Sequence, residues 1–151
     1  MATLDPRQIK YLIVHCTATA RGKDFTAADV DRWHRQQGWD MIGYHYLVRL
    51  DGTIETGRPT TMQGAHCKGY NHQSLGICYV GGLDAQGRRP EDTRTTAQIA
   101  ALGALLKRLR RQYPKARIVG HHNLNPGKAC PSFDARAEYA DLCPTPHTPT
   151  H

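Results

Sequence analysis

The segment from His121 to Pro131 combines residue types that can hold a metal ion. It reads HHNLNPGKACP, with a histidine pair at one end, Cys130 near the other and a turn-forming Asn-Pro-Gly between them. Such a loop can fold its histidine and its cysteine back onto one ion. Zinc accepts imidazole nitrogen at ~2.0–2.1 Å and thiolate sulfur at ~2.3 Å, and catalytic zinc takes three protein ligands and leaves one position for water. Many loops hold a histidine and a cysteine by chance, so the spacing alone is weak evidence for a metal site.

A third ligand is available at the end of a predicted strand. Residues 9–14 form a near-continuous apolar run, typical of a strand buried on both faces, and His15 follows it directly. Open α/β sheets place their ligands at the carboxyl ends of such strands. His15 can therefore complete the ligand set.

The other histidines fall into two groups. Six of the nine stand at predicted strand ends or in loops, as an active site on one sheet edge requires: His15, His45, His66, His72, His121 and His122. His34 lies inside a predicted helix beside a tryptophan, which favours a structural role. His147 and His151 lie in the tail, where we expect exposed side chains without a role in the site.

The elements that must position these residues follow from the hydrophobic pattern and from turn signals. Capping boxes predict two helix starts, at Thr26 with Asp29 and at Thr95 with Gln98, and Gly38 can stop the first helix. The second helix carries an apolar stripe of leucines. A weaker helix is predicted over residues 132–142. Strands are predicted at residues 9–14, 44–50, 53–56, 75–80 and 117–120, with a hairpin turn at Asp-Gly between the second and the third.

This order of elements, β-α-β-β-β-α-β-α, predicts an α/β fold in which a mixed central β-sheet carries helices on its faces. Residues 1–143 are expected to form a single domain, which agrees with the usual domain size. Residues 144–151 are polar and rich in proline and threonine, so we expect a disordered tail there.

Composition limits the classes of protein to consider. The formal charge is +7, but the basic residues form no single block, and the densest run, residues 107–111, fits the solvated face of a helix. We find no recognisable nucleic-acid motif and no apolar run of the ~20 residues that span a bilayer. Residues 1–10 lack the apolar stretch of a secretory signal, so we expect the protein to start in a cytoplasm. The five cysteines are odd in number and form no CxxC pair, so without an export signal we expect no disulfide framework, and Cys16, Cys67 and Cys78 are expected to be buried thiols.

Over residues 9–139 the sequence resembles a known family. The resemblance is carried, in order, by VHCTA at 14–18, GW at 38–39, GYH at 43–45, DGT at 51–53, His66 with KGYNH at 68–72, GICYVGG at 76–82, HH at 121–122 and KACPSFD at 128–134. These segments are similar to those of the phage T7 lysozyme-like N-acetylmuramoyl-L-alanine amidases, in the superfamily of type-2 amidases and peptidoglycan recognition proteins. So many segments in the same order are far more specific than any single motif.

The resemblance implies roles for individual residues. One zinc ion per chain would be held by His15, His121 and Cys130, the catalytic residues would be Tyr44 and Lys128, and His66 would bind substrate at the rim of the groove. The loop before Cys130 is one residue longer than in the family, with Gly127 added, and we take His121 rather than His122 as the ligand because it directly follows a strand. The expected reaction is hydrolysis of the amide bond between N-acetylmuramic acid and L-alanine in peptidoglycan. The missing export signal fits a phage or prophage endolysin that reaches the wall after release.

The general base is the open point of this mechanism. The chain has no HExxH motif, and its glutamates, Glu55, Glu91 and Glu138, lie in segments not predicted at the metal. A tyrosine with a pKa near ~10 is a poor base unless zinc lowers that pKa. Tyr44 is therefore given a catalytic role without an assigned proton transfer.

Alternatives from other classes remain. A peptidoglycan-binding module without catalysis occurs in the superfamily, but here all three ligand positions and both catalytic positions are filled. A regulatory role is an alternative because phage T7 lysozyme also binds and inhibits its phage RNA polymerase. A cytosolic wall-recycling amidase would use an acidic third ligand in place of Cys130. We expect a monomer that binds peptidoglycan, with no direct nucleic-acid partner and no membrane contact.

Overall fold

The computed structural model describes residues 2–142 and contains a five-stranded sheet with the strand order β4-β3-β5-β1-β7. These strands are β1 (Tyr11–Cys16), β3 (Tyr46–Val48), β4 (Ile54–Thr56), β5 (Ser74–Tyr79) and β7 (Arg117–Gly120). Strand β1 runs parallel to β5 and β7, and β3 runs parallel to β5 but antiparallel to β4. The predicted α/β class with a mixed central sheet is confirmed.

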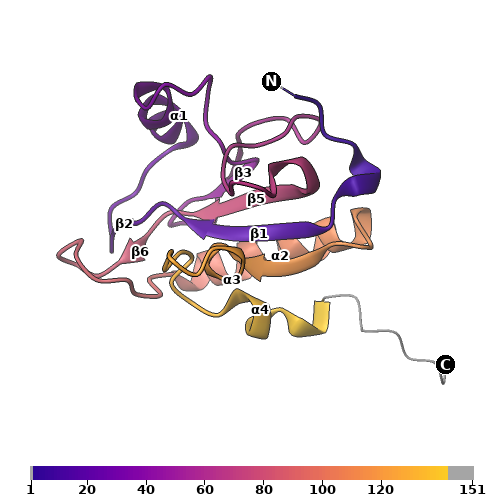
Figure 1. Ribbon diagram of the computed structural model, residues 1–151. Helices are drawn as coiled ribbons and strands as arrows, with labels where there is room; N and C mark the ends of the chain where they lie inside the picture. Colours follow the sequence, from indigo (N-terminus) through magenta and orange to yellow (C-terminus); the bar gives the residue numbers. More distant parts are fainter. Residues whose placement is uncertain (1, 143–151) are drawn as a thin grey trace.

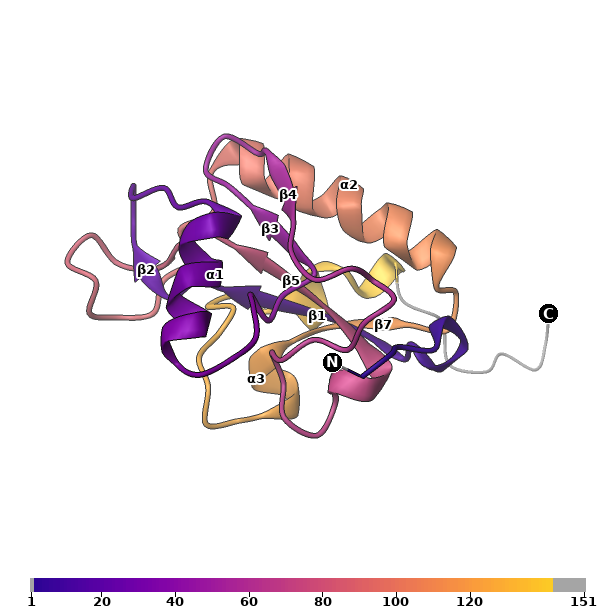
Figure 2. The same ribbon diagram turned by 90° about the horizontal axis from the view of Figure 1, so that it is seen from above.

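The helices form layers on the two faces of the sheet (Figure 1). The long helix α2 (Thr96–Gln112) covers one face together with α4 (Ala135–Glu138), and α1 (Ala27–Gln36) lies over the other face, as the view from above also shows (Figure 2). A short helix, α3 (His121–Leu124), follows β7 directly. In the part of the chain that the structure describes, three 3-10 helices are also present, at Pro6–Gln8, Asn71–Gln73 and Ala140–Leu142. Within residues 2–142, none of the helices combines the length and apolar character needed to cross a bilayer.

Side-chain alternation along β1 assigns its residues to the two faces. Leu12 and Val14 belong to the large core cluster that includes the leucine stripe of α2. Ile13 packs instead with Cys67 and Val119, on the opposite face of the sheet. His15 follows Ile13 by two residues, so its side chain leaves the strand on the face that is not covered by α2.

Local signals predicted the two main helices well. Thr26 caps α1 and Thr95 caps α2, each with the reciprocal hydrogen bonds of a capping box. Gly38 follows α1 with φ +94°, a conformation that glycine adopts without strain. The hairpin between β3 and β4 is also present, and Gly52 in its turn has φ +88°.

Other boundaries differ from the prediction. The predicted helix over 132–142 is wrong in its first part: Ser132 has φ +68°, which no α-helix accommodates, and α4 begins only at Ala135, after Asp134 has accepted the Ala137 N–H as N-cap. The two-residue strands β2 (Thr19–Ala20) and β6 (Gly82–Leu83) pair with each other and were not predicted. Cys143, His147, His151 and the predicted tail 144–151 lie outside the described residues.

Candidate metal centre

Two parallel strands bring the two histidines of the site to one edge of the sheet. His15 is the fifth residue of β1, and His121 is the first residue after β7, which pairs with β1 through Tyr11–Val14. Because the carboxyl ends of parallel strands meet at one edge, the imidazole rings lie together, with centroids 4.6 Å apart. His15 is buried, with 1% of its surface exposed, and His121 is half-buried.

Hydrogen bonds from strands β1 and β5 and from helix α3 hold the Cys130 loop against this edge. The Cys16 N–H donates to Cys130 Sγ at 3.0 Å, and the His122 N–H donates to the Cys130 carbonyl at 2.9 Å. The Tyr79 hydroxyl, from β5, donates to the Pro131 carbonyl at 2.7 Å. Gly120 permits this close packing, since a Cβ there would lie 2.7 Å from the Pro131 ring.

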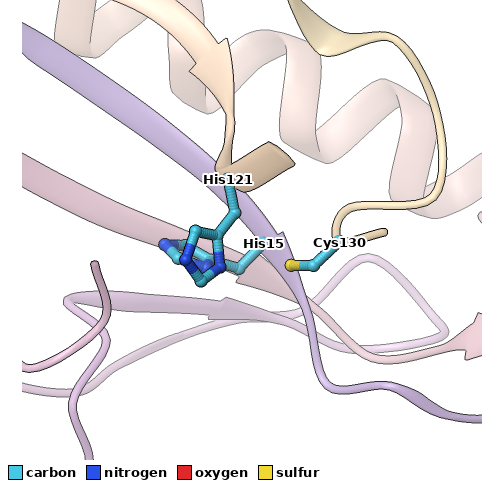
Figure 3. A group of neighbouring side chains, drawn as sticks. All are labelled: His15, His121 and Cys130. Carbon is cyan, nitrogen blue, oxygen red and sulfur yellow. The ribbon is translucent and has the colours of Figure 1, made fainter. Parts of the chain in front are cut away.

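The three predicted ligands converge. One ligand atom each from His15, His121 and Cys130 can be chosen so that all lie within 4.8 Å of one another, and Figure 3 shows the three side chains meeting in front of β1. Among residues 2–142 this is the one group of three or more His, Cys, Asp or Glu side chains that converges so closely. Two imidazoles and one thiol are the donors that zinc prefers, and three protein ligands with an open fourth position are typical of catalytic zinc. The residues therefore fit a catalytic zinc ion.

The electrostatics of the site favour neutral imidazoles. Burial lowers the pKa of His15 well below its ordinary value, and the neighbouring His66 and His121 lower it further. Burial, followed by the positive charge of Lys128, also lowers the pKa of His121. Neutral imidazole is the form that binds a metal, so both rings are ready to coordinate at neutral pH.

The two predicted catalytic residues approach this centre differently. The Tyr44 ring lies 5.1 Å, centroid to centroid, from the His15 ring, and burial raises the pKa of its hydroxyl well above the ordinary value. Lys128 is exposed in the loop two residues before Cys130, where its N–H donates to the Asn125 carbonyl at 3.0 Å.

The remaining predicted histidines do not all reach the site. His66 does: it is buried, and its Nδ1 lies 2.8 Å from His15 Nε2. His45 lies one ring further away, 5.8 Å from His66 between centroids. His72 is exposed, and His122 Nε2 is buried without a hydrogen-bond partner in the described part of the chain.

His34 takes the structural role predicted for it: it is buried, and its Nδ1 accepts the Gly43 N–H at 2.8 Å. Cys16, Cys67 and Cys78 are buried free thiols, as expected.

The hydrogen bonds and ion pairs of the three glutamates are made away from the site. Glu55 accepts the N–H of Ala27, while Glu91 and Glu138 are paired with arginines. Sequence reasoning missed Tyr79, whose hydroxyl holds the Cys130 loop through the Pro131 carbonyl, because nothing in a strand sequence reveals which distant backbone group a hydroxyl will meet.

Comparisons with known proteins agree with this geometry. The family model described as N-acetylmuramoyl-L-alanine amidase matches residues 5–133. The chain is 47% identical over 128 residues to the endolysin of Enterobacteria phage K11, covering 85% of this chain and 83% of that protein. It is 42% identical over 125 residues to the endolysin of Escherichia phage T7, covering 83% and 82%.

A solved structure has the same architecture. The N-acetylmuramoyl-L-alanine amidase LysC from Clostridium intestinale superimposes with a TM-score of 0.76 at 29% identity, over 91% of this chain and 87% of that one. The matched family model spans both the strand that carries His15 and the loop that carries Cys130. The chain belongs to the N-acetylmuramoyl-L-alanine amidase family of type-2 amidases and is an amidase of that family.

Proposed function

We propose that the chain is a phage endolysin that hydrolyses the amide bond between N-acetylmuramic acid and L-alanine, with one zinc ion held by His15, His121 and Cys130. The observation that carries the proposal is the convergence of these three donors at one sheet edge in a chain of the amidase family. After synthesis in the host, the enzyme would act on the wall once it is released.

The ion would supply a Lewis acid for the scissile carbonyl and a bound water whose pKa falls from ~15.7 to about 7. The protein's own part is to hold the ligands in place and to stabilise the charge that develops on the carbonyl oxygen. Lys128 can bring an ammonium to that charge from the ligand loop. Tyr44 can donate a hydrogen bond, because a hydroxyl with a raised pKa keeps its proton at neutral pH.

Proton transfer is assigned to no glutamate. The carboxylates of Glu55, Glu91 and Glu138 are engaged by other parts of the chain. The raised pKa of Tyr44 argues for a donor rather than a base in the metal-free protein. Substrate binding by His66 stays a prediction. Its ring lies beside that of His15, so it belongs to the same site. An RNA polymerase partner stays outside the proposal, since no contact or motif in residues 2–142 points to one.

The test is a digest of purified peptidoglycan, with the products identified by mass spectrometry. We expect peptides with a new L-alanine amino terminus and glycan strands with intact glycosidic bonds. His121→Ala and Cys130→Ser should abolish this product, while His72→Ala serves as the control because His72 is exposed and is no predicted ligand. Cleavage between sugars, or full activity of both ligand variants, would contradict the proposal.

A further inference from the structure

A chain of hydrogen bonds runs from His15 through His66 and Ser74 into the interior and ends on a backbone carbonyl; we call these three side chains the relay. His15 Nε2 lies 2.8 Å from His66 Nδ1. His66 Nε2 lies 3.4 Å from Ser74 Oγ, which donates to the Tyr70 carbonyl at 2.7 Å. All three side chains are buried, with 1%, 8% and 0% of their surfaces exposed. Water therefore does not compete for these groups, and their donors and acceptors must match one another.

The last link fixes the direction of the whole chain. A carbonyl only accepts, so the single Ser74 hydroxyl proton points at Tyr70, and the short 2.7 Å distance supports this choice over the 3.4 Å contact. Ser74 Oγ must then accept from His66 Nε2, which places the His66 proton on Nε2. His66 Nδ1 is left as an acceptor, and it can be satisfied only by a proton on His15 Nε2.

The consequence at His15 concerns its other ring nitrogen. A neutral imidazole carries one proton, so His15 with a proton on Nε2 has a free lone pair on Nδ1. In the described part of the chain no hydrogen bond is made to that nitrogen. In the reverse arrangement, with the His66 proton on Nδ1, the His15 proton would move to Nδ1, and the atom free to bind a metal would be the one that faces His66.

The surroundings of His66 hold its ring in this orientation. A Cβ on Gly76 would lie 2.7 Å from His66 Cγ, and a Cβ on Gly64 would lie 2.5 Å from His66 Cδ2, so two glycines make room for the ring. The Asn71 side chain accepts the backbone N–H groups of His66 and Cys67, each at 3.0 Å. The position of the ring is therefore restricted by its backbone hydrogen bonds and by the close approach of Gly64 and Gly76, in addition to the hydrogen bonds of the ring nitrogens.

We propose that Ser74 and His66 are positioning residues that hold His15 in its Nε2–H tautomer, so that His15 presents Nδ1 to the metal. This proposal rests on the proposed zinc site and assigns the coordinating atom of one ligand. Partners of this kind fix the tautomer of ligating histidines, and their loss typically weakens metal affinity about 10–100-fold.

The first test needs no variant. In metal-free wild-type protein labelled with ¹⁵N, long-range correlation of the ring nitrogens with the ring carbon-bound protons reports the tautomer of each histidine. We expect protonated Nε2 and unprotonated Nδ1 at both His15 and His66. A proton on Nδ1 of either ring would overturn the proposal.

The second test uses Ser74→Ala, which removes the hydroxyl that accepts from His66 Nε2. We expect His66 to lose its single tautomer and zinc to bind about 10–100-fold more weakly in a competition titration with a chromophoric chelator. Thr95→Ala is the matched control: it removes a hydroxyl that caps α2 and makes no contact with the relay, so it should leave zinc affinity unchanged. Wild-type affinity and wild-type tautomers in Ser74→Ala would overturn the proposal.

These results separate the relay from the proposed function. A wild-type chain that binds no zinc would overturn the proposed metal site and, with it, the assignment of Nδ1 as a ligand atom. A wild-type chain that binds one zinc ion, together with a Ser74→Ala variant that binds it equally well, would overturn the relay alone.

Discussion

Tyr44 is the residue whose hydroxyl we expect to act directly on the reacting carbonyl. Its ring packs against His15, and burial, followed by the neighbouring Cys78 thiol, raises the pKa of the hydroxyl. Tyr44→Phe should therefore lower kcat/KM about 10²–10³-fold, the usual loss for one donor to an oxyanion, and leave zinc affinity unchanged. Steady-state kinetics on soluble muropeptides with zinc saturating would measure this.

Tyr46→Phe is the matched control for that change. Tyr46 lies two residues after Tyr44, as the first residue of β3, and packs against the core on the α2 side. We therefore expect near-wild-type kinetics. Equal activity of the two variants would remove Tyr44 from the catalytic set.

We expect Lys128, which lies at an exposed position, to act through its charge. Its ammonium contributes to the lowered pKa of His121, so this charge lies near the proposed metal ligands. Lys128→Met should lower kcat/KM roughly 10²-fold, and it should raise the pKa of His121 in the metal-free protein, since a cation disfavours a second positive charge. Kinetics and an NMR titration of the His121 ring check the two effects.

Lys115→Met controls for the loss of one positive charge elsewhere, because Lys115 lies in the turn before β7. An unchanged His121 pKa in Lys128→Met would show that the ammonium does not reach the site.

Among the elements, the segment after Cys130 depends on one arginine. The Arg94 side chain is 3% exposed, pairs with Asp92 and Glu138 at 2.9 and 2.7 Å, and lies 3.4 Å over the Phe133 ring. It therefore ties the segment before α2 to α4. Because a broken buried ion pair costs about 3–5 kcal/mol and both carboxylates here are partly exposed, Arg94→Met should lower the free energy of unfolding by roughly 2–3 kcal/mol.

Urea unfolding followed by circular dichroism measures this loss. Arg35→Met is the comparison, since Arg35 forms an exposed pair with Asp31 four residues earlier in α1 and should cost less than about 0.5 kcal/mol. A similar cost for both variants would contradict the role of Arg94.

At the scale of helices and strands, the sequence predicted the features that depend on neighbouring residues and missed those that depend on residues far apart in the chain. Thr26 and Thr95 predicted the starts of their helices because a capping box is formed within four consecutive residues. The strands β2 and β6 are two residues each and exist only because Thr19 and Ala20 meet Gly82 and Leu83 across the fold, so no local pattern predicts them. The late start of α4 depends on the backbone at Ser132, which tertiary contacts of the Cys130 loop determine.

The sequence predicted the proposed metal ligands of the site, but not the contacts that hold these ligands and their loop in place. His15, His121 and Cys130 were recognisable by residue type, strand position and family resemblance, and their convergence is observed. The contacts of His66 with His15 and Ser74 join residues 51 and eight positions apart, and the hydroxyl of Tyr79 reaches Pro131 across 52 positions. Such contacts depend on which strands become neighbours, which the sequence alone leaves open.

For the molecule as a whole, buried histidines make stability depend on pH. His45 is 1% exposed, its Nδ1 accepts the Gly76 N–H and its Nε2 lies 2.8 Å from the Met62 carbonyl. Burial lowers its pKa from 6.5 to about 4. Because the unfolded chain binds the proton more readily, the contribution of His45 is complete above pH 6.5 and is lost as the pH falls towards 4, by about 3 kcal/mol.

Urea unfolding of the metal-free protein between pH 7 and 4 measures this loss without a contribution from zinc release. His45→Gln should reduce the slope of unfolding free energy against pH, whereas His72→Gln, at an exposed position, should keep it. The account of His45 fails if the two variants have the same slope as the wild type.

The most direct test of the proposed zinc site is to restore activity to chelator-treated protein by titration with zinc. We predict that peptidoglycan hydrolysis is absent without metal, rises linearly with added zinc and reaches its plateau at one ion per chain, and that Cys130→Ser shows no such rise. Full hydrolysis by the metal-free protein, or a plateau that Cys130→Ser reaches at the same stoichiometry, would contradict the assignment of His15, His121 and Cys130 as the catalytic metal site.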